Sequence, residues 1–116
     1  GAGVATDLAR IQSRRGQVLL ELARLPEARA AFVEARTLFS ETLGLDHATA
    51  WQATAGLALV EARMGDPAAA ERLFHSVAEA PGYDLAVNAG RRAEAEALHA
   101  RILAESASRA ASPLLP

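Results

Sequence analysis

The chain repeats itself at a spacing of 42 residues. Ala28 and Phe32, in the segment LPEARAAFVEA, return 42 positions later as Ala70 and Phe74, in the segment DPAAAERLFHSVAEA. Gly16 is likewise followed by a small residue at the equivalent position of the second segment. An internal repeat of this length indicates stacked supersecondary units rather than one closed core. We therefore expect a solenoid, which presents an extended surface and seldom contains chemistry of its own.

Helix signals recur along the whole chain, and no stretch shows the alternating, β-branched pattern of a strand. The pattern predicts five helices, at Thr6 or Asp7 to about Ala23, Pro26 to Leu43, Asp46 to Gly65, Pro67 to Pro81, and Asp84 to about Glu105. Asp46 and Asp66 are expected to cap the third and fourth helices, and Gly44 and Gly65 to end the second and third. The stretch Asn88-Ala89-Gly90 is a point where the fifth helix could break.

Apolar residues three and four positions apart define the faces that we expect to be buried. In the first helix these are Leu8, Ile11, Val18, Leu19 and Leu22, and in the second they are Ala28, Ala31, Phe32, Ala35, Leu38 and Phe39. Trp51 is the sole tryptophan. We expect it to pack between the second and third helices; the alternative is that it is presented to a ligand.

Composition narrows the class of protein. A formal charge of −2 with interspersed signs argues against nucleic-acid binding, which needs a basic face. All 12 basic residues are arginine, which, with the abundance of alanine, indicates a GC-rich bacterial genome. The absence of cysteine excludes disulfides and thiol nucleophiles and fits a cytoplasmic protein. No apolar run approaches the ~20 residues of a membrane span, so no membrane association is expected.

Residues that could support catalysis or bind a metal do not form a recognisable motif. The three histidines, His47, His75 and His99, are too far apart in sequence to place two ligands on one helical face. Glu94 and Glu96, two residues apart on a helix, point to different faces. No serine lies in a nucleophile elbow, and no glycine-rich phosphate loop is present. We therefore expect no enzymatic activity, no cofactor and no metal.

The two units resemble tetratricopeptide repeats, helical hairpins with small residues at positions 8, 20 and 27, a turn residue at 15 and phenylalanine at 24. The first unit supplies Gly16, Ala23, Ala28, Phe32 and Ala35, and the second supplies Ala58, Gly65, Ala70, Phe74 and Val77. Small side chains allow two helices to approach closely, and the phenylalanine fills the space beside them.

The junction TLGLDHATAW is similar to the linker of a 42-residue subclass of these repeats, found in kinesin light chains and in many bacterial signalling proteins. The matching residues are Leu43, Gly44, Asp46, His47 and Thr49. Ala48 stands where that subclass usually has proline, which makes the turn less rigid.

This resemblance implies an all-α, right-handed α-solenoid of antiparallel helix hairpins, with two repeat units and a C-terminal capping helix. We expect a flank at residues 1–7, two hairpins at 8–80, a capping helix or degenerate third repeat at 81–106 and a flexible tail at 107–116.

The resemblance also implies a non-catalytic protein-protein interaction module within a larger bacterial signalling or regulatory protein. In this family the first helix of each hairpin lines a concave face that binds a peptide or protein. The residues that would lie there are Arg10, Ser13, Arg14, Gln17 and Glu21, followed by Gln52, Ala55, Gly56, Leu59 and Arg63.

The three arginines of this face indicate an acidic or carboxylate-ended peptide as the partner. The lysine and asparagine set that chaperone-binding members use to hold a terminal carboxylate is absent, so a chaperone-tail receptor is not expected. The alternative function is self-association into a homodimer. An exposed apolar stripe at Leu85, Ala89, Ala93, Ala97 and Ala100 would favour it.

Overall fold

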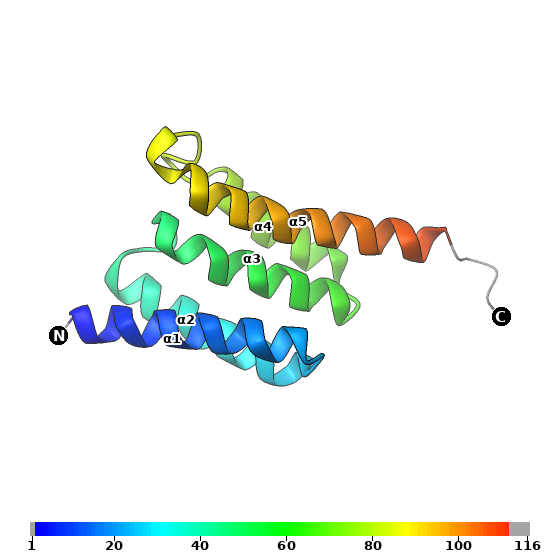
Figure 1. Cartoon of the computed structure of the whole chain (residues 1–116), viewed down its shortest axis with the longest axis horizontal. Coiled ribbons are helices and arrows are strands. Elements are labelled where there is room, and N and C mark those ends of the chain that lie inside the picture. Colours follow the sequence, from blue (N-terminus) through cyan, green and yellow to red (C-terminus); the bar gives the residue numbers. More distant parts are fainter. Residues whose placement is uncertain (1, 112–116) are drawn as a thin grey trace.

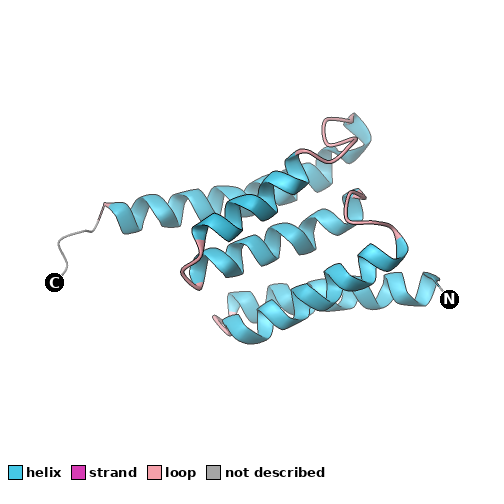
Figure 2. Cartoon of the chain, turned by 180° about the vertical axis from the view of Figure 1, so that it is seen from behind, coloured by secondary structure: helices cyan, strands magenta, loops and turns pink. Residues whose placement is uncertain are grey.

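Helices arranged in two layers make up the chain. The computed structural model describes residues 2–111, and within that range it contains no strand. The elements are α1 (Ala2–Glu21), α2 (Leu25–Thr42), α3 (Ala48–Arg63), α4 (Pro67–Ala78), a 3₁₀ turn at Ala86–Asn88 and α5 (Ala89–Ala110). Helices α1, α3 and α5 lie side by side in one layer, with α2 and α4 behind them (Figures 1 and 2). The predicted all-helical stack of hairpins is confirmed.

The core of the first unit is built around Phe32 of α2, which is fully buried. Its ring lies against two glycines, Gly16 of α1 and Gly56 of α3. A Cβ atom added to Gly16 would lie 2.8 Å from the ring, and one added to Gly56 would lie 2.5 Å from it. Real Cβ atoms do not approach so closely, so the ring occupies the space that these two side chains would fill. The predicted buried face of α2 is confirmed, with Leu38 partly buried.

A second cluster surrounds Trp51, which is fully buried on α3. Its ring centroid lies 5.3 Å from that of Tyr83, and Phe74 and Val77 of α4 belong to the same cluster. The expected burial is therefore correct, but the expected neighbours are wrong, since the cluster joins α3 to α4 and α5 rather than to α2. The indole Nε1 donates a hydrogen bond to the carbonyl of Asp46 at 3.0 Å.

Helices α1 and α3, each the first helix of a hairpin, end in the same way. After α1, the N–H groups of Ala23 and Arg24 donate to the carbonyls of Leu20 and Leu19 at 3.0 and 2.9 Å. After α3, Gly65 and the residue that follows it repeat this arrangement. Such a Schellman turn needs a left-handed residue, and Gly65 (φ 94°) provides it without strain, whereas Ala23 (φ 60°) does not.

Three predicted helix starts differ from the structure. Helix α1 begins at Ala2 rather than at Thr6 or Asp7. The N-cap of α3 is His47, whose Nδ1 accepts a hydrogen bond from the N–H of Thr49 at 3.1 Å. The predicted cap, Asp46, precedes it, and its backbone carbonyl accepts the hydrogen bond from the indole of Trp51. The third difference is the start of the fifth helix.

The fifth helix begins at Ala89, not at Asp84. The side chain of Asn88 donates to the carbonyl of Gly82 at 2.9 Å, and the guanidinium of Arg92 bonds to the carbonyl of Tyr83. These bonds hold residues 82–88 in a folded loop. The helix then continues to Ala110, so residues 107–110 of the predicted tail are helical. Ala111 follows as a turn residue, and residues 112–116 of that tail lie outside the described residues.

The buried face of α1 was predicted wrongly. Of the five residues expected there, only Leu19 is buried, and Leu8, Ile11, Val18 and Leu22 are exposed. The face that packs against α2 is formed by smaller residues together with one leucine: Ala9, Ser13, Gly16 and Leu20. Close approach to Phe32 selects small side chains on α1, and this need outweighs the preference for burying the largest apolar residues.

Replacing Ala23 by glycine is expected to stabilise the protein. The substitution relieves the left-handed strain at the end of α1 and should raise the free energy of unfolding by about 0.5–1 kcal/mol. Urea denaturation measures the change. Ala30→Gly, at an exposed position inside α2, is the control and should lower stability by a similar amount. A loss of stability in both variants would show that Ala23 is not strained.

Replacing Gly56 by alanine is expected to destabilise the protein by about 1–3 kcal/mol, because the new methyl group would overlap the buried Phe32 ring. The matched control is Gly90→Ala in α5, where an added Cβ meets nothing within 4 Å. That change should be neutral or stabilising by up to about 1 kcal/mol, because alanine is the better helix former. Thermal unfolding measures the change in stability of both variants, and equal midpoints for Gly56→Ala and Gly90→Ala would contradict the prediction.

Candidate partner-binding surface

Four of the predicted site residues come together in a recess of the layer formed by α1, α3 and α5. Arg10, Ser13 and Arg14 of α1 lie with Gln52 of α3 around a volume of about 110 Å³. Three residues that were not predicted complete the lining: Phe39, Thr49 and Arg91. We call these seven residues the arginine groove. Arg91 comes from α5. The sequence could have placed it in this surface, because position 91 follows Thr49 by one further period of 42 residues.

Several predicted face residues are not available to a partner. Ala55 and Leu59 are fully buried, and Gly56 is in contact with Phe32. Ser13 is also largely buried, although it reaches the arginine groove. Gln17 is half-buried and lies outside the groove. Most of the residues of the second hairpin that were predicted to lie on an accessible concave face are therefore buried, because α3 is covered on more sides than α1.

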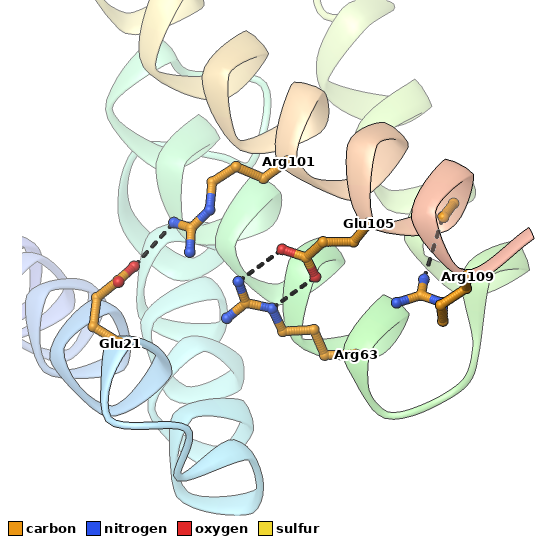
Figure 3. A network of polar contacts seen from close by, with 6 residues as sticks. Glu21, Arg63, Arg101, Glu105 and Arg109 are labelled. Carbon is orange, nitrogen blue, oxygen red and sulfur yellow. Dashed lines mark hydrogen bonds and ion pairs between the residues drawn. The ribbon is translucent and has the colours of Figure 1, made fainter. Parts of the chain in front are cut away.

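The remaining two predicted residues, Glu21 and Arg63, are in ion pairs with α5. Arg63 donates to both carboxylate oxygens of Glu105, at 2.9 Å from Nε and 2.8 Å from Nη2 (Figure 3). Arg101 donates to Glu21 at 2.9 Å, which links α5 to α1 across the layer (Figure 3). Arg63 therefore does not contribute free positive charge to a partner.

The two-pronged contact between Arg63 and Glu105 shifts both groups toward their charged forms. The hydrogen bonds from Arg63 lower the pKa of the Glu105 carboxyl below its usual value, against the opposing effect of its partial burial. The pKa of Arg63 is raised for the same reason. Bidentate pairs of this kind are among the stronger polar contacts in proteins, so α5 is fixed against α3 at this point.

The arginine groove, by contrast, has positive charge in its lining and no negative charge; Asp7 lies beside Arg10 and Arg14 in an adjoining recess. Its lining contains three guanidinium groups, those of Arg10, Arg14 and Arg91, and no carboxylate. Within residues 2–111 these three arginines form no ion pair or side-chain hydrogen bond. Its volume matches one carboxylate-bearing side chain or chain end rather than a whole peptide.

A larger recess, of about 460 Å³, lies over α2, α3 and α4. It contains both signs of charge, with three arginines and two carboxylates in its lining. Arg29 pairs with Glu61 at 2.7 Å, and Arg36 donates to Thr54 at 3.0 Å. Burial lowers the pKa of Arg36, although not its charge at neutral pH. Because this recess also contains Asp66 as well as Glu61, it is a weaker candidate for an acidic partner.

The histidines and carboxylates do not assemble a centre for catalysis in the part of the chain that is described. No group of three or more histidine, aspartate or glutamate side chains there could hold a metal ion. His99 stacks on Phe74, with ring centroids 3.9 Å apart, and its Nε2 lies 3.1 Å from Glu71. Over the same residues, no helix is long and apolar enough to cross a membrane.

The helical hairpins and their repeated packing define a class of repeat protein. The sequence model of the family described as tetratricopeptide repeat matches residues 7–80, which is more than half of the chain. The chain therefore belongs to the tetratricopeptide repeat family. Searches of curated proteins and of solved structures gave no match. Members of this family are in general protein-protein interaction modules and typically non-catalytic scaffolds.

The ion pair between Arg63 and Glu105 makes stability depend on pH. A carboxyl whose pKa is lowered in the folded state stabilises that state above its unfolded pKa, and this contribution is lost as pH falls through the folded pKa. Glu105→Gln should therefore cost about 1 kcal/mol at pH 7 and progressively less between about pH 5 and pH 3.

Urea denaturation at a series of pH values measures this difference. The control is Glu27→Gln, which removes the exposed ion pair between Arg24 and Glu27 at the start of α2. Its effect on the free energy of unfolding should be small at every pH. A pH-independent effect of Glu105→Gln would contradict the role given to its charge.

Proposed function

We propose that this chain is a module that binds an acidic peptide, or a carboxylate-bearing segment of a protein partner, in the arginine groove. The observation that supports this most directly is the gathering of Arg10, Arg14 and Arg91 around one recess without a counter-charge. Guanidinium groups bind carboxylates through paired hydrogen bonds, and a partner that brings negative charge here relieves the repulsion among them. Gln52 and Thr49 add uncharged polar groups to the same lining.

The setting that we propose follows the resemblance of the inter-repeat junction. Repeats of 42 residues with this junction occur in larger bacterial signalling and regulatory proteins. We therefore propose a non-catalytic segment of such a protein, acting in the cytoplasm, whose task is to bring a partner to it. Neither nucleic acid nor a membrane is part of this proposal.

Self-association is the second candidate, and one observation favours it. Leu85 and the four alanines of the predicted stripe, Ala89, Ala93, Ala97 and Ala100, are all exposed. A second copy could cover this face of α5. Sedimentation velocity on the chain and on Ala93→Glu with Ala97→Glu tests it, because a dimer formed here would dissociate in the variant.

Reversing the charge of the groove is expected to remove binding of acidic peptides. The variant combines Arg10→Glu, Arg14→Glu and Arg91→Glu, none of which breaks a described contact. Arg63 is left intact, since its reversal would break the pair with Glu105. A displayed peptide library, in which each acidic peptide has a copy with Asn and Gln in place of Asp and Glu, gives the readout. The original chain should prefer acidic peptides by about tenfold or more, and the preference should weaken at high salt.

The matched control carries the same change in charge elsewhere, through Arg24→Glu, Arg72→Glu and Arg109→Glu at exposed positions. It should keep the preference for acidic peptides. If the groove variant, shown to be folded by circular dichroism, selects the same peptides as the original chain, the groove is not the binding site. Equal loss in both variants would mean that net charge alone governs binding.

A further inference from the structure

Helix α1 has an apolar face that no other part of residues 2–111 covers. Its residues follow one another at steps of three and four along one side of the helix: Val4, Leu8, Ile11, Val18 and Leu22, with Arg15 in the same line. We call the five apolar residues the α1 seam. Each is exposed, by between 47% and 63%. Single exposed apolar residues are ordinary, but a continuous line of five along one helix indicates an interaction surface.

Two of the five seam positions, those of Ile11 and Val18, are buried in both later units, whereas Met64, the equivalent of Leu22 after one period, is 43% exposed. The residues that follow Ile11 and Val18 after one and two periods of 42 are Ala53 and Val60 in α3, then Ala95 and Ile102 in α5. Ile11 and Val18 are 58% and 59% exposed, whereas their four equivalents are exposed by 2% or less. The 42-residue period therefore marks the seam as a face that is covered by another helix wherever a preceding unit is present.

The helix that covers the third unit shows what an occupant opposite a basic residue must offer; in α2, which covers the second unit, the residue equivalent to Glu71 is Arg29. In the third unit, the position equivalent to Arg15 is His99. It is covered by α4, which places Glu71 3.1 Å from its Nε2 and stacks Phe74 on its ring. Val77, one turn further along α4, belongs to the same buried cluster. A helix with the pattern Glu-x-x-Phe-x-x-Val thus covers this position inside the chain itself.

Gln12 provides a second, independent observation. Its Oε1 is enclosed by surrounding atoms, and within residues 2–111 it has no hydrogen-bond partner. The equivalent residue of the next unit, Thr54, accepts a hydrogen bond from Arg36 of the covering helix α2 at 3.0 Å. Buried polar atoms are rarely left unpaired, and of these two equivalent positions the one that has a covering helix is satisfied.

The charges around the seam distinguish between occupants. Arg10, Arg14 and Arg15 lie on α1 and take part in none of the described ion pairs, while Glu21 is already paired with Arg101. Two copies packed through α1 would bring these arginines together, and like charges at an interface oppose association. An acidic helix would instead place carboxylates opposite them.

We propose that the α1 seam is a docking site for an acidic amphipathic helix with the pattern of α4. Its apolar residues cover Leu8, Ile11 and Val18, and its carboxylate faces Arg15. This is recognition of a helix by an apolar face, and that face borders the arginine groove, because Arg10 and Arg14 line a recess together with Asp7 and Ile11. The proposal does not depend on what the arginine groove binds.

A helical peptide of this chain's own residues 66–80 is the probe. A staple between positions 68 and 72, both exposed on α4, preserves the helix and leaves the Glu71, Phe74 and Val77 side chains free. Fluorescence anisotropy of the labelled peptide measures its affinity for the full chain. Ile11→Gln with Val18→Gln should weaken binding by about tenfold or more. Val33→Gln, at an exposed valine of α2, is the matched control and should leave the affinity unchanged.

A charge swap tests the contact with Arg15. Arg15→Glu should weaken binding of the peptide about fivefold, and a peptide with Glu71→Arg should recover the affinity for that variant. The proposal is overturned if the original chain does not bind the peptide, if the seam variant binds it as tightly, or if the swap restores nothing. It is also overturned if sedimentation shows a dimer that Ile11→Gln with Val18→Gln dissociates, since a second copy would then occupy the seam. Arg91→Glu alone, which alters the arginine groove from α5 and leaves the arginines of α1 in place, should leave the affinity for the peptide unchanged, and this separates the test from that of the arginine groove.

Discussion

The insertion of one aromatic ring between two glycines is the constraint on which the rest of the structure depends. Phe32 of α2 reaches through to Gly16 and Gly56, which belong to neighbouring helices of the other layer. Its contact with both fixes how far α1 stands from α3. Five of the seven residues of the arginine groove come from the same two helices, so the position of Arg10 and Arg14 relative to Gln52 depends on the spacing that the buried ring sets.

The second unit has a phenylalanine at the same position, Phe74, but the residues around its ring differ from those around Phe32. The residues 42 positions after the two glycines are Ala58 and Leu98, so Phe74 cannot settle as deeply as Phe32. It remains slightly exposed and is held instead by stacking on His99, almost parallel at an interplanar angle of 4°. The helices are therefore repeated but the contacts are not: Phe32 is seated between two glycines, whereas Phe74 is stacked on a histidine that also contacts Glu71.

The sequence predicts the fold well because its strongest signals are local. The caps, breakers and repeated small residues place the first four helices, as the pairs Asp66-Pro67 and Ala70 with Phe74 illustrate. The candidate site was harder to predict because it depends on what covers each helix. Leu59 of α3 and Ile11 of α1 are both apolar residues on the first helix of a hairpin. Leu59 is nevertheless buried and Ile11 is exposed, because α3 has neighbouring helices on both sides and α1 does not. The pairing of Arg63 with Glu105 joins residues 42 apart and could be found only by extending the period into α5.

The contact between Glu21 and Arg101 changes the mechanical character of this stack. In a solenoid each unit touches only its neighbours, so the array bends and twists like a spring. Here a charged contact passes over α3 and joins the first helix directly to the last, while a second one fastens α3 to the same helix one turn further on. Closing the layer in this way resists the opening motion that would flatten its curvature. Because the Glu21 carboxylate is well exposed, this contact contributes at most about 1 kcal/mol, so it favours the curved form of the layer without locking it.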